Sequence, residues 1–282
     1  MFEGIYGMSC VENQVLAILR EQRNDIRPLY HNSAIPLREL MDRMLIQGEK
    51  PYRFYRVPRI QDELKAMGRI EIALHKEANT DAVREHIRRC GNGKEGRYVL
   101  VRVTPEFTKT VLHARGFRED HYVRAVPAGR DFLLYNDIPD TAVSLGEAAF
   151  GDSFTGEFLS LSLHGSLGDR EKAQLWDNRL FRPEQPGSFP AGTGTLMIER
   201  LRDLLGVCKT MRYRMRAYYG QYVDTDFIGE LLSVVERDYA KAEYWNLRKS
   251  APEQAPAALL EELWRQDARM MEQLTERLEE KQ

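Results

Sequence analysis

The sequence predicts an α+β protein that ends in a separate helical region. Apolar residues recur at helical spacing from residue 11 onward, and again in three long segments after residue 194, as on the buried face of a helix. Between these segments the period changes to two over residues 97–103 and 121–137, as expected of strands. We therefore expect one domain over residues 1–165 and a helical subdomain over residues 166–282.

The first predicted helix begins at a cysteine. Ser9 and Glu12 have the S-x-x-E spacing of a capping box, in which the serine oxygen accepts from a backbone N–H and the glutamate reaches back. This spacing places Cys10 in the first helical turn. The apolar face that follows contains Val11, Val15, Ile18 and Leu19. Three further helices are expected over residues 36–48, 60–68 and 79–91, each ending at a glycine.

Five segments are expected to form strands. Residues 97–103 are apolar and β-branched on both faces, which suits a central strand. Two alternating runs, 121–126 and 132–137, flank a turn at 127–131 that contains proline and glycine, and together they predict a β-hairpin. The other strands are expected at 70–74 and 158–163, whereas residues 106–120 show no regular pattern.

The carboxyl-terminal region is predicted to be helical. Residues 182–192 are rich in proline and glycine and favour a loop. Helical patterns follow over residues 195–220, 225–247 and 256–279, and the last of these is rich in Glu, Leu and Arg.

Basic and aromatic side chains interleave over residues 209–222, a pattern that can bind nucleic acid. However, the chain carries a formal net charge of -2, and Arg212, Arg216 and Tyr219 share one helical face. We therefore expect a solvated or core-flanking helix and no nucleic-acid partner. If this face does bind a partner, we favour an acidic carrier protein or its phosphopantetheine phosphate.

Cys10 is a candidate nucleophile, because the N-terminus of a helix favours a thiolate. The alternative is a small, buried, structural cysteine. Cys10, Cys90 and Cys208 are widely separated and odd in number, so neither a disulfide framework nor a zinc site is expected. We expect a cytoplasmic protein without a metal or a membrane span, since no stretch of about 18 consecutive apolar residues occurs.

The predicted hairpin supplies a base and an orienting residue for that nucleophile. If residues 127–131 form a five-residue loop, Val126 pairs with Phe132 and His121 lies opposite Asp137. Directly opposed residues have Cβ atoms about 4.5–5.5 Å apart, so Asp137 is expected to orient the imidazole. A two-residue loop at 128–129 would place Asn136 there instead. Among the other histidines, His164 at a strand end remains a rival base.

Three short motifs resemble those of papain-like cysteine enzymes: Gly7-x-x-Cys10, His121-Tyr122-Val123, and Tyr135-Asn136-Asp137-Ile138-Pro139. Within these enzymes the chain is most similar, over about residues 4–165, to the family of the butirosin-biosynthesis acyltransferase H, related in fold to bacteriocin-processing peptidases. The resemblance implies a papain-like domain and a catalytic triad of Cys10, His121 and Asp137. It implies acyl transfer from a carrier-protein thioester to an amine.

The sequence departs from the papain-like pattern at the oxyanion site. Papain-like peptidases usually carry a glutamine several residues before the cysteine, and none precedes Cys10 here. The backbone N–H of Cys10 is one candidate donor, and Tyr6, Asn13 or Gln14 is a candidate for the second. Asp137 is followed by Ile138-Pro139 where the family has Asp-Pro, and Arg124 stands in the strand where aliphatic residues are usual.

Three functions follow from these observations. The leading hypothesis is acyl transfer in secondary-metabolite biosynthesis, from an acyl or peptidyl carrier protein to a small-molecule amine, with no cofactor except the phosphopantetheine that arrives on the carrier. The second is a cysteine peptidase or amidase, a thiol hydrolase that uses the same three residues. The third is a non-catalytic helical interaction protein in which Cys10 is structural. A homodimer is possible in each case.

Overall fold

The computed structural model describes residues 4–50, 60–76, 78–114, 120–165 and 195–281. The chain divides into two compact units. The first comprises Met1–Asp25 and Arg59–Glu171, and the second comprises Ile26–Pro58 and Lys172–Gln282. Residues 26–58 therefore group with the carboxyl-terminal helices, which the expected division at residue 165 did not include. The predicted loop at 182–192 lies outside the described residues.

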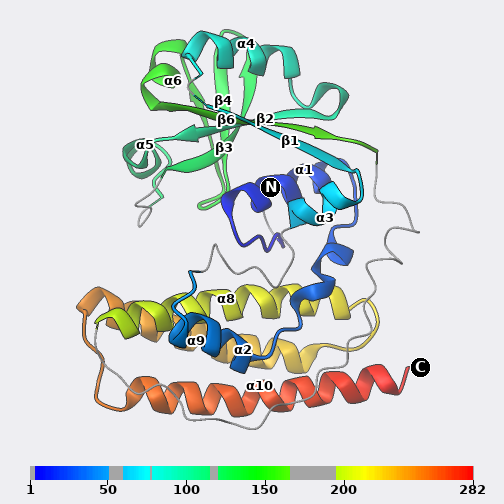
Figure 1. Cartoon of the computed structure of the whole chain (residues 1–282), viewed down its shortest axis with the longest axis vertical. Coiled ribbons are helices and arrows are strands. Elements are labelled where there is room, and N and C mark those ends of the chain that lie inside the picture. The colour runs from blue at the N-terminus through cyan, green and yellow to red at the C-terminus, as the bar shows by residue number, and fades with distance from the viewer. Residues whose placement is uncertain (1–3, 51–59, 77, 115–119, 166–194, 282) are drawn as a thin grey trace. The chain divides into compact units, whose positions relative to one another are not determined.

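The first unit contains the antiparallel sheet predicted from the alternating segments (Figure 1). Its six strands lie in the order β1-β6-β2-β3-β4-β5, and every neighbouring pair is antiparallel. The protein is thus α+β, as expected. The strands are β1 (Ile70–His75), β2 (Arg97–Val103), β3 (His121–Ala128), β4 (Asp131–Asn136), β5 (Thr141–Leu145) and β6 (Phe154–Leu163).

Helices cover both faces of this sheet. On one face, helix α4 (Thr80–Cys90) contributes Val83 and Ile87 to a buried cluster with valines of β2 and β3. On the other face lie α1 (Cys10–Glu21) and α3 (Ile60–Ala66) (Figure 1). The end of α1 is fixed to β3, because the buried Arg124 donates to both carboxylate oxygens of Glu21 at 2.6 and 2.8 Å.

Among the α-helices and strands of the described residues, α5 (Pro105–Thr110), β5 and α6 (Glu147–Ser153) were not predicted. The expectation of irregular structure from residue 106 is wrong at its start. Thr104 caps α5, since its hydroxyl accepts from the N–H of Phe107 at 3.2 Å, and Pro105 takes the first helical position, where its missing N–H has no cost. Residues 115–119 of the same segment lie outside the described part.

The predicted register of the β3–β4 hairpin is wrong by one residue. Val126 pairs with Leu133, not Phe132, and Ala128 pairs with Asp131, which leaves a two-residue loop at 129–130. A two-residue loop at 128–129 would put Ala128 at positive φ, which is strained. The observed loop begins one residue later, so Gly129 takes the positive φ, at +67°, which glycine does without a steric penalty.

The second unit is helical. Its long helices are α8 (Thr195–Tyr219), α9 (Asp226–Arg248) and α10 (Ala255–Glu279), close to the three predicted segments. The earlier part of this unit contains a 3₁₀ segment η1 (Arg27–Ser33), α2 (Leu37–Met41) and one π-helical turn η2 (Asp42–Ile46). The apolar residues of this early segment are buried with the long helices, which explains why it belongs to this unit: Leu29, Leu37, Leu40, Met41 and Met44.

A buried ion pair holds the second unit together. The Arg212 guanidinium donates from Nε to Asp267 Oδ1 at 2.8 Å and from Nη2 to the carbonyl of Ile35 at 2.9 Å. Asp267 Oδ2 in turn accepts from the N–H of Leu37 at 2.8 Å. Both charged side chains are almost fully buried, so the interaction joins α8, α10 and the segment before α2.

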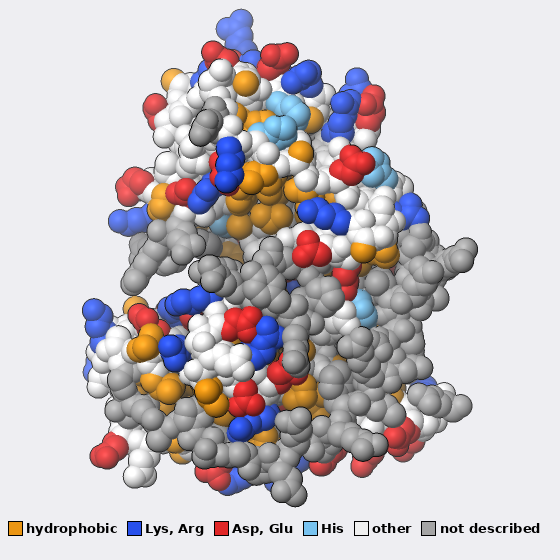
Figure 2. All heavy atoms as spheres, in the orientation of Figure 1, with side chains coloured by type: hydrophobic (Ala, Val, Ile, Leu, Met, Phe, Trp, Pro, Cys, Tyr) orange, Lys and Arg blue, Asp and Glu red, His pale blue; other side chains and the backbone are white. Residues whose placement is uncertain are grey.

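This burial removes Arg212 from any docking surface. Arg216 is half exposed and Tyr219 is buried, so the three residues predicted to share one face do not form an accessible patch. On the face drawn in Figure 2, acidic and basic side chains of the described residues are interspersed. A carrier protein would therefore have to bind a surface that does not include Arg212.

None of the helices in the described ranges is both long enough and apolar enough to cross a membrane.

Candidate functional site

Cys10 is the first residue of α1 and is a free, partly exposed thiol. The capping box predicted around it is present in a modified form. Ser9 Oγ accepts from the N–H of Glu12 at 3.2 Å. The Glu12 carboxylate accepts from the N–H of Met8 at 2.5 Å and from that of Ile60 at 3.1 Å. The glutamate thus fixes the residue before the cap, and ties the start of α1 to α3.

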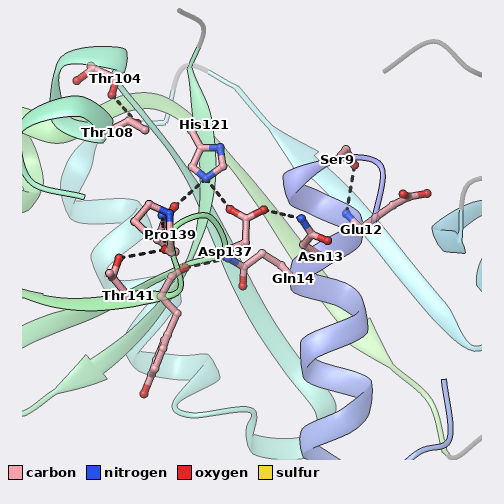
Figure 3. A network of polar contacts seen from close by, with 12 residues as sticks. Ser9, Glu12, Asn13, Gln14, Thr104, Thr108, His121, Asp137, Pro139 and Thr141 are labelled. Atoms are coloured by element: carbon pink, nitrogen blue, oxygen red, sulfur yellow. Dashed lines mark hydrogen bonds and ion pairs between the residues drawn. The ribbon is translucent and has the colours of Figure 1, made fainter. Parts of the chain in front are cut away.

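His121 and Asp137 lie side by side, as predicted (Figure 3). The distance between His121 Nε2 and Asp137 Oδ1 is 2.9 Å, and the side chains are only 2% and 3% exposed. His121 Nε2 also lies 2.8 Å from Asn136 Oδ1. Asn136 Nδ2 donates to the carbonyl of Pro139 at 2.8 Å, which turns its oxygen toward the imidazole. Both residues considered as orienting partners therefore contact the same ring nitrogen.

Asp137 contacts His121 from a turn and not from the paired strand on which it was predicted. The β3–β4 ladder ends at Arg124 and Tyr135, and β4 ends at Asn136. Asp137 follows the strand, in the turn before β5. Two consecutive residues on a strand would point to opposite faces. Because the chain turns after Asn136, both side chains can instead face one imidazole.

The surroundings of His121 favour its protonated form. Burial by itself lowers the pKa of His121, but hydrogen bonds to Asp137 and Cys10, together with the charges of those groups, raise it to about 10. The imidazole therefore carries a proton at neutral pH. The hydrogen bond to Cys10 and the contact with Asp137 are thus made by the same imidazole. The structure thus brings Cys10, His121 and Asp137 together.

The side-chain amides of Asn13 and Gln14, two candidates for the second oxyanion donor, both have hydrogen-bond partners in the structure. Asn13 Nδ2 donates to Asp137 Oδ2 at 2.7 Å, and Asn13 Oδ1 accepts from the N–H of Gly7 at 2.9 Å. Gln14 is fully buried and its Nε2 donates to the carbonyl of Tyr135 at 2.8 Å. The N–H of Cys10 remains a candidate because the first turn of a helix supplies no acceptor for it.

A second polar group borders the site and was not predicted. The Tyr122 hydroxyl donates to Glu157, and Arg102 pairs with Glu157 at 3.2 Å and with Asp120 at 3.1 Å. Burial and the bond to Glu157 raise the pKa of Tyr122, and the charge of Cys10 adds to the shift. Tyr122 therefore stays protonated near the thiol. The sequence carried no signal for this group, because its members fall in or beside separate predicted strands.

The other candidates are not part of this site. His164 lies beyond the far end of β6 from His121, since Val103 pairs with both Phe154 and His121. Its ring is half exposed and lies 3.6 Å from Glu71. Cys90 and Cys208 are buried, and burial raises the pKa of both thiols, that of Cys208 to about 12.

Within the described ranges, no three His, Cys, Asp or Glu side chains cluster in a way that could hold a metal ion. The chemistry that the site residues themselves can supply is acid–base and nucleophilic. A thiol in contact with an imidazole, which is in turn oriented by a carboxylate, is the arrangement of an activated cysteine nucleophile.

No protein-family model matches this chain, and no curated protein is similar to it in sequence.

Proposed function

We propose that the first unit is a papain-like cysteine acyltransferase in which Cys10 is the nucleophile, His121 the acid and base, and Asp137 the residue that orients His121. The observation that carries this proposal is the contact of one buried imidazole with both Cys10 and Asp137. Asn136 shares the orienting role, since it contacts the same nitrogen.

The reaction would begin on a thioester. The Cys10 sulfur attacks the carbonyl carbon, the C–S bond to the donor breaks, and the donor thiol leaves with a proton supplied by His121. An amine then attacks the acyl-enzyme and passes its proton to His121 while Cys10 is released. No oxidant or reductant is needed, and the products are an amide and a free thiol.

A thioester donor is favoured by the resemblance of the three motifs to the butirosin acyltransferase family. A carrier protein would present its acyl group on phosphopantetheine, so the enzyme needs no cofactor of its own. The acceptor would be a small-molecule amine. The N–H of Cys10 at the start of α1 supports the carbonyl oxygen during attack.

The test uses acyl thioesters of N-acetylcysteamine and matched acyl p-nitroanilides, followed by intact-protein mass measurement. We expect the full chain to gain one acyl group from a thioester. The acyl group should persist longest in His121→Ala, which cannot pass the proton of the incoming amine, and be absent in Cys10→Ala. Cys90→Ala is the matched control, because its thiol is in the same unit but buried, and it should be acylated like the unmodified chain.

Product analysis then separates the three functions. Amide formation with a primary amine such as ethanolamine supports acyl transfer. Release of the free acid alone, or turnover of the p-nitroanilide in preference to the thioester, would show a thiol hydrolase. Absence of any adduct with either donor class would refute covalent catalysis and favour an interaction protein.

A further inference from the structure

We propose that Asn13 is a positioning residue of this site, joining the loop before Cys10 to the Asp137 carboxylate. The inference rests on the proposed function, because it assigns Asn13 a part in the chemistry at Cys10. One amide makes both connections: Nδ2 donates to Asp137 Oδ2 at 2.7 Å, and Oδ1 accepts from the N–H of Gly7 at 2.9 Å. Asn13 is 8% exposed and its bond to Asp137 is buried, so water competes little for that bond.

These contacts close a ring of interactions around the nucleophile. Cys10 contacts His121, His121 contacts Asp137 Oδ1, and Asp137 Oδ2 contacts Asn13. Asn13 then returns to the cysteine by two paths. Its side chain holds Gly7, three residues before Cys10, and its backbone N–H donates to the carbonyl of Ser9 at 2.9 Å. Asn13 therefore fixes Asp137 relative to the turn that carries the sulfur, and Figure 3 shows its bond to Asp137.

The chemistry of the two partners requires an amide at this position. Asp137 Oδ2 is an acceptor and needs a donor, whereas the Gly7 N–H is a donor and needs an acceptor. A leucine of similar volume would satisfy neither, and an aspartate would place a second carboxylate against Asp137. Glycine at position 7 belongs to the same arrangement, since a Cβ there would lie 2.3 Å from Asn13 Oδ1.

Gln14 provides a matched control on the same helix. It also bonds across to the end of β4, but its partner is the backbone carbonyl of Tyr135 at 2.8 Å and not the carboxylate. Replacing the buried Gln14 with methionine removes this hydrogen bond of α1 without removing a partner of Asp137. A merely structural role for Asn13 would make both substitutions alike in their effect on Cys10.

The experiment measures the rate of Cys10 alkylation by iodoacetamide from pH 5 to 9, in the unmodified chain and in Asn13→Leu, Gln14→Met, Asp137→Asn and the Asn13→Leu/Asp137→Asn double variant. We expect Asn13→Leu to slow alkylation by about tenfold or more at pH 8, as misplacement of reacting groups does, and to move the midpoint of the pH profile. The double variant should be within about twofold of Asp137→Asn alone, because Asn13 acts through that carboxylate. Gln14→Met should keep the profile of the unmodified chain.

Two results would overturn the inference. One is an Asn13→Leu profile that matches that of Gln14→Met, and the other is an effect that adds fully to that of Asp137→Asn. If Asn13→Leu does not fold, Asn13→Asp replaces it, since it keeps an acceptor for Gly7, and an unchanged alkylation rate at pH 8 would likewise refute the role. A failure of the proposed function looks different: the profile of the unmodified chain would then be the same as that of His121→Gln.

Discussion

Replacing Asp137 with asparagine should change the charge of His121 at neutral pH. The substitution keeps the shape of the side chain but removes the negative charge 2.9 Å from His121 Nε2. His121 has a pKa of about 10 in the intact site, against an ordinary value of 6.5, and its burial acts to lower it. Without the carboxylate only Cys10 raises the pKa of His121 against the effect of burial, so we expect that pKa to fall toward its ordinary value of 6.5.

The size of the effect follows from these two values. At pH 8 an imidazole with a pKa of about 10 is about 99% protonated, whereas one with a pKa of 6.5 is about 3% protonated. The protonated population thus drops by up to roughly 30-fold. Because this proton is the one that His121 supplies to the leaving thiol, acylation of Cys10 at pH 8 should slow by up to a similar factor.

The pKa of His121 can be measured from the Cε1–H resonances in an NMR titration. The chain has six histidines, so the resonance is assigned by its loss in His121→Gln. Asp131→Asn is the matched control, because Asp131 is an exposed carboxylate at the other end of the same hairpin. If His121 in Asp137→Asn still titrates above pH 9, Asp137 does not control the charge of the imidazole and the assignment of its role is wrong.

Three further predictions concern stability and access to the nucleophile. Because the pKa of His121 is raised on folding, its stabilising contribution is complete below pH 6.5 and is lost as the pH rises toward 10. We therefore expect urea unfolding to show that the free energy of unfolding of the unmodified chain, relative to that of His121→Gln, falls by up to about 1.4 kcal/mol per pH unit in that range. Asp267→Asn should cost about 3–5 kcal/mol in urea unfolding, since it leaves the buried Arg212 without its counter-charge. Gly7→Ala should slow alkylation of Cys10 about tenfold, because its Cβ would displace Asn13.

Each of these has its own control and contradicting result. A stability difference between the unmodified chain and His121→Gln that grows with pH would reverse the sign argued here. Glu261→Gln, on the exposed side of α10, should change stability by less than about 0.5 kcal/mol; an equally small loss in Asp267→Asn would show that the pair is not needed. Gly146→Ala is the control for Gly7→Ala, because a Cβ at position 146 would meet its nearest neighbour at 3.8 Å, and it should leave the alkylation rate of Cys10 unchanged. Equal alkylation rates in the two variants would contradict the reasoning.

The sequence predicted the helix and strands that carry the site more accurately than the register in which the strands pair. The capping pattern at Ser9 and Glu12 located the start of α1, because a cap depends on residues within one turn. The register of the hairpin was missed by one residue because it depends on which residue takes a positive φ, and Gly129 was available beside Ala128. Asp137 still contacts His121, but from a turn and not from the strand.

The roles of longer-range partners could not be read from local patterns. Asn13 was considered as an oxyanion donor, whereas its partner is a carboxylate 124 residues later in the chain. Arg212 was expected on a solvated or core-flanking helix face, and its partner Asp267 lies 55 residues away on another helix. A hydrophobic pattern shows that a face is buried, but a buried charge breaks the pattern and is recognised only with its partner in place.

The grouping of residues 26–58 with the carboxyl-terminal helices also constrains the order of events during synthesis. The N–H of Leu37 bonds to a carboxylate 230 residues later, on α10. At ordinary translation rates, roughly 10 to 50 s pass between the appearance of the two partners at the ribosome. Until α8 and then α10 have been made, the apolar side of α2 lacks its full cover, so this segment is where we expect a chaperone to bind the nascent chain.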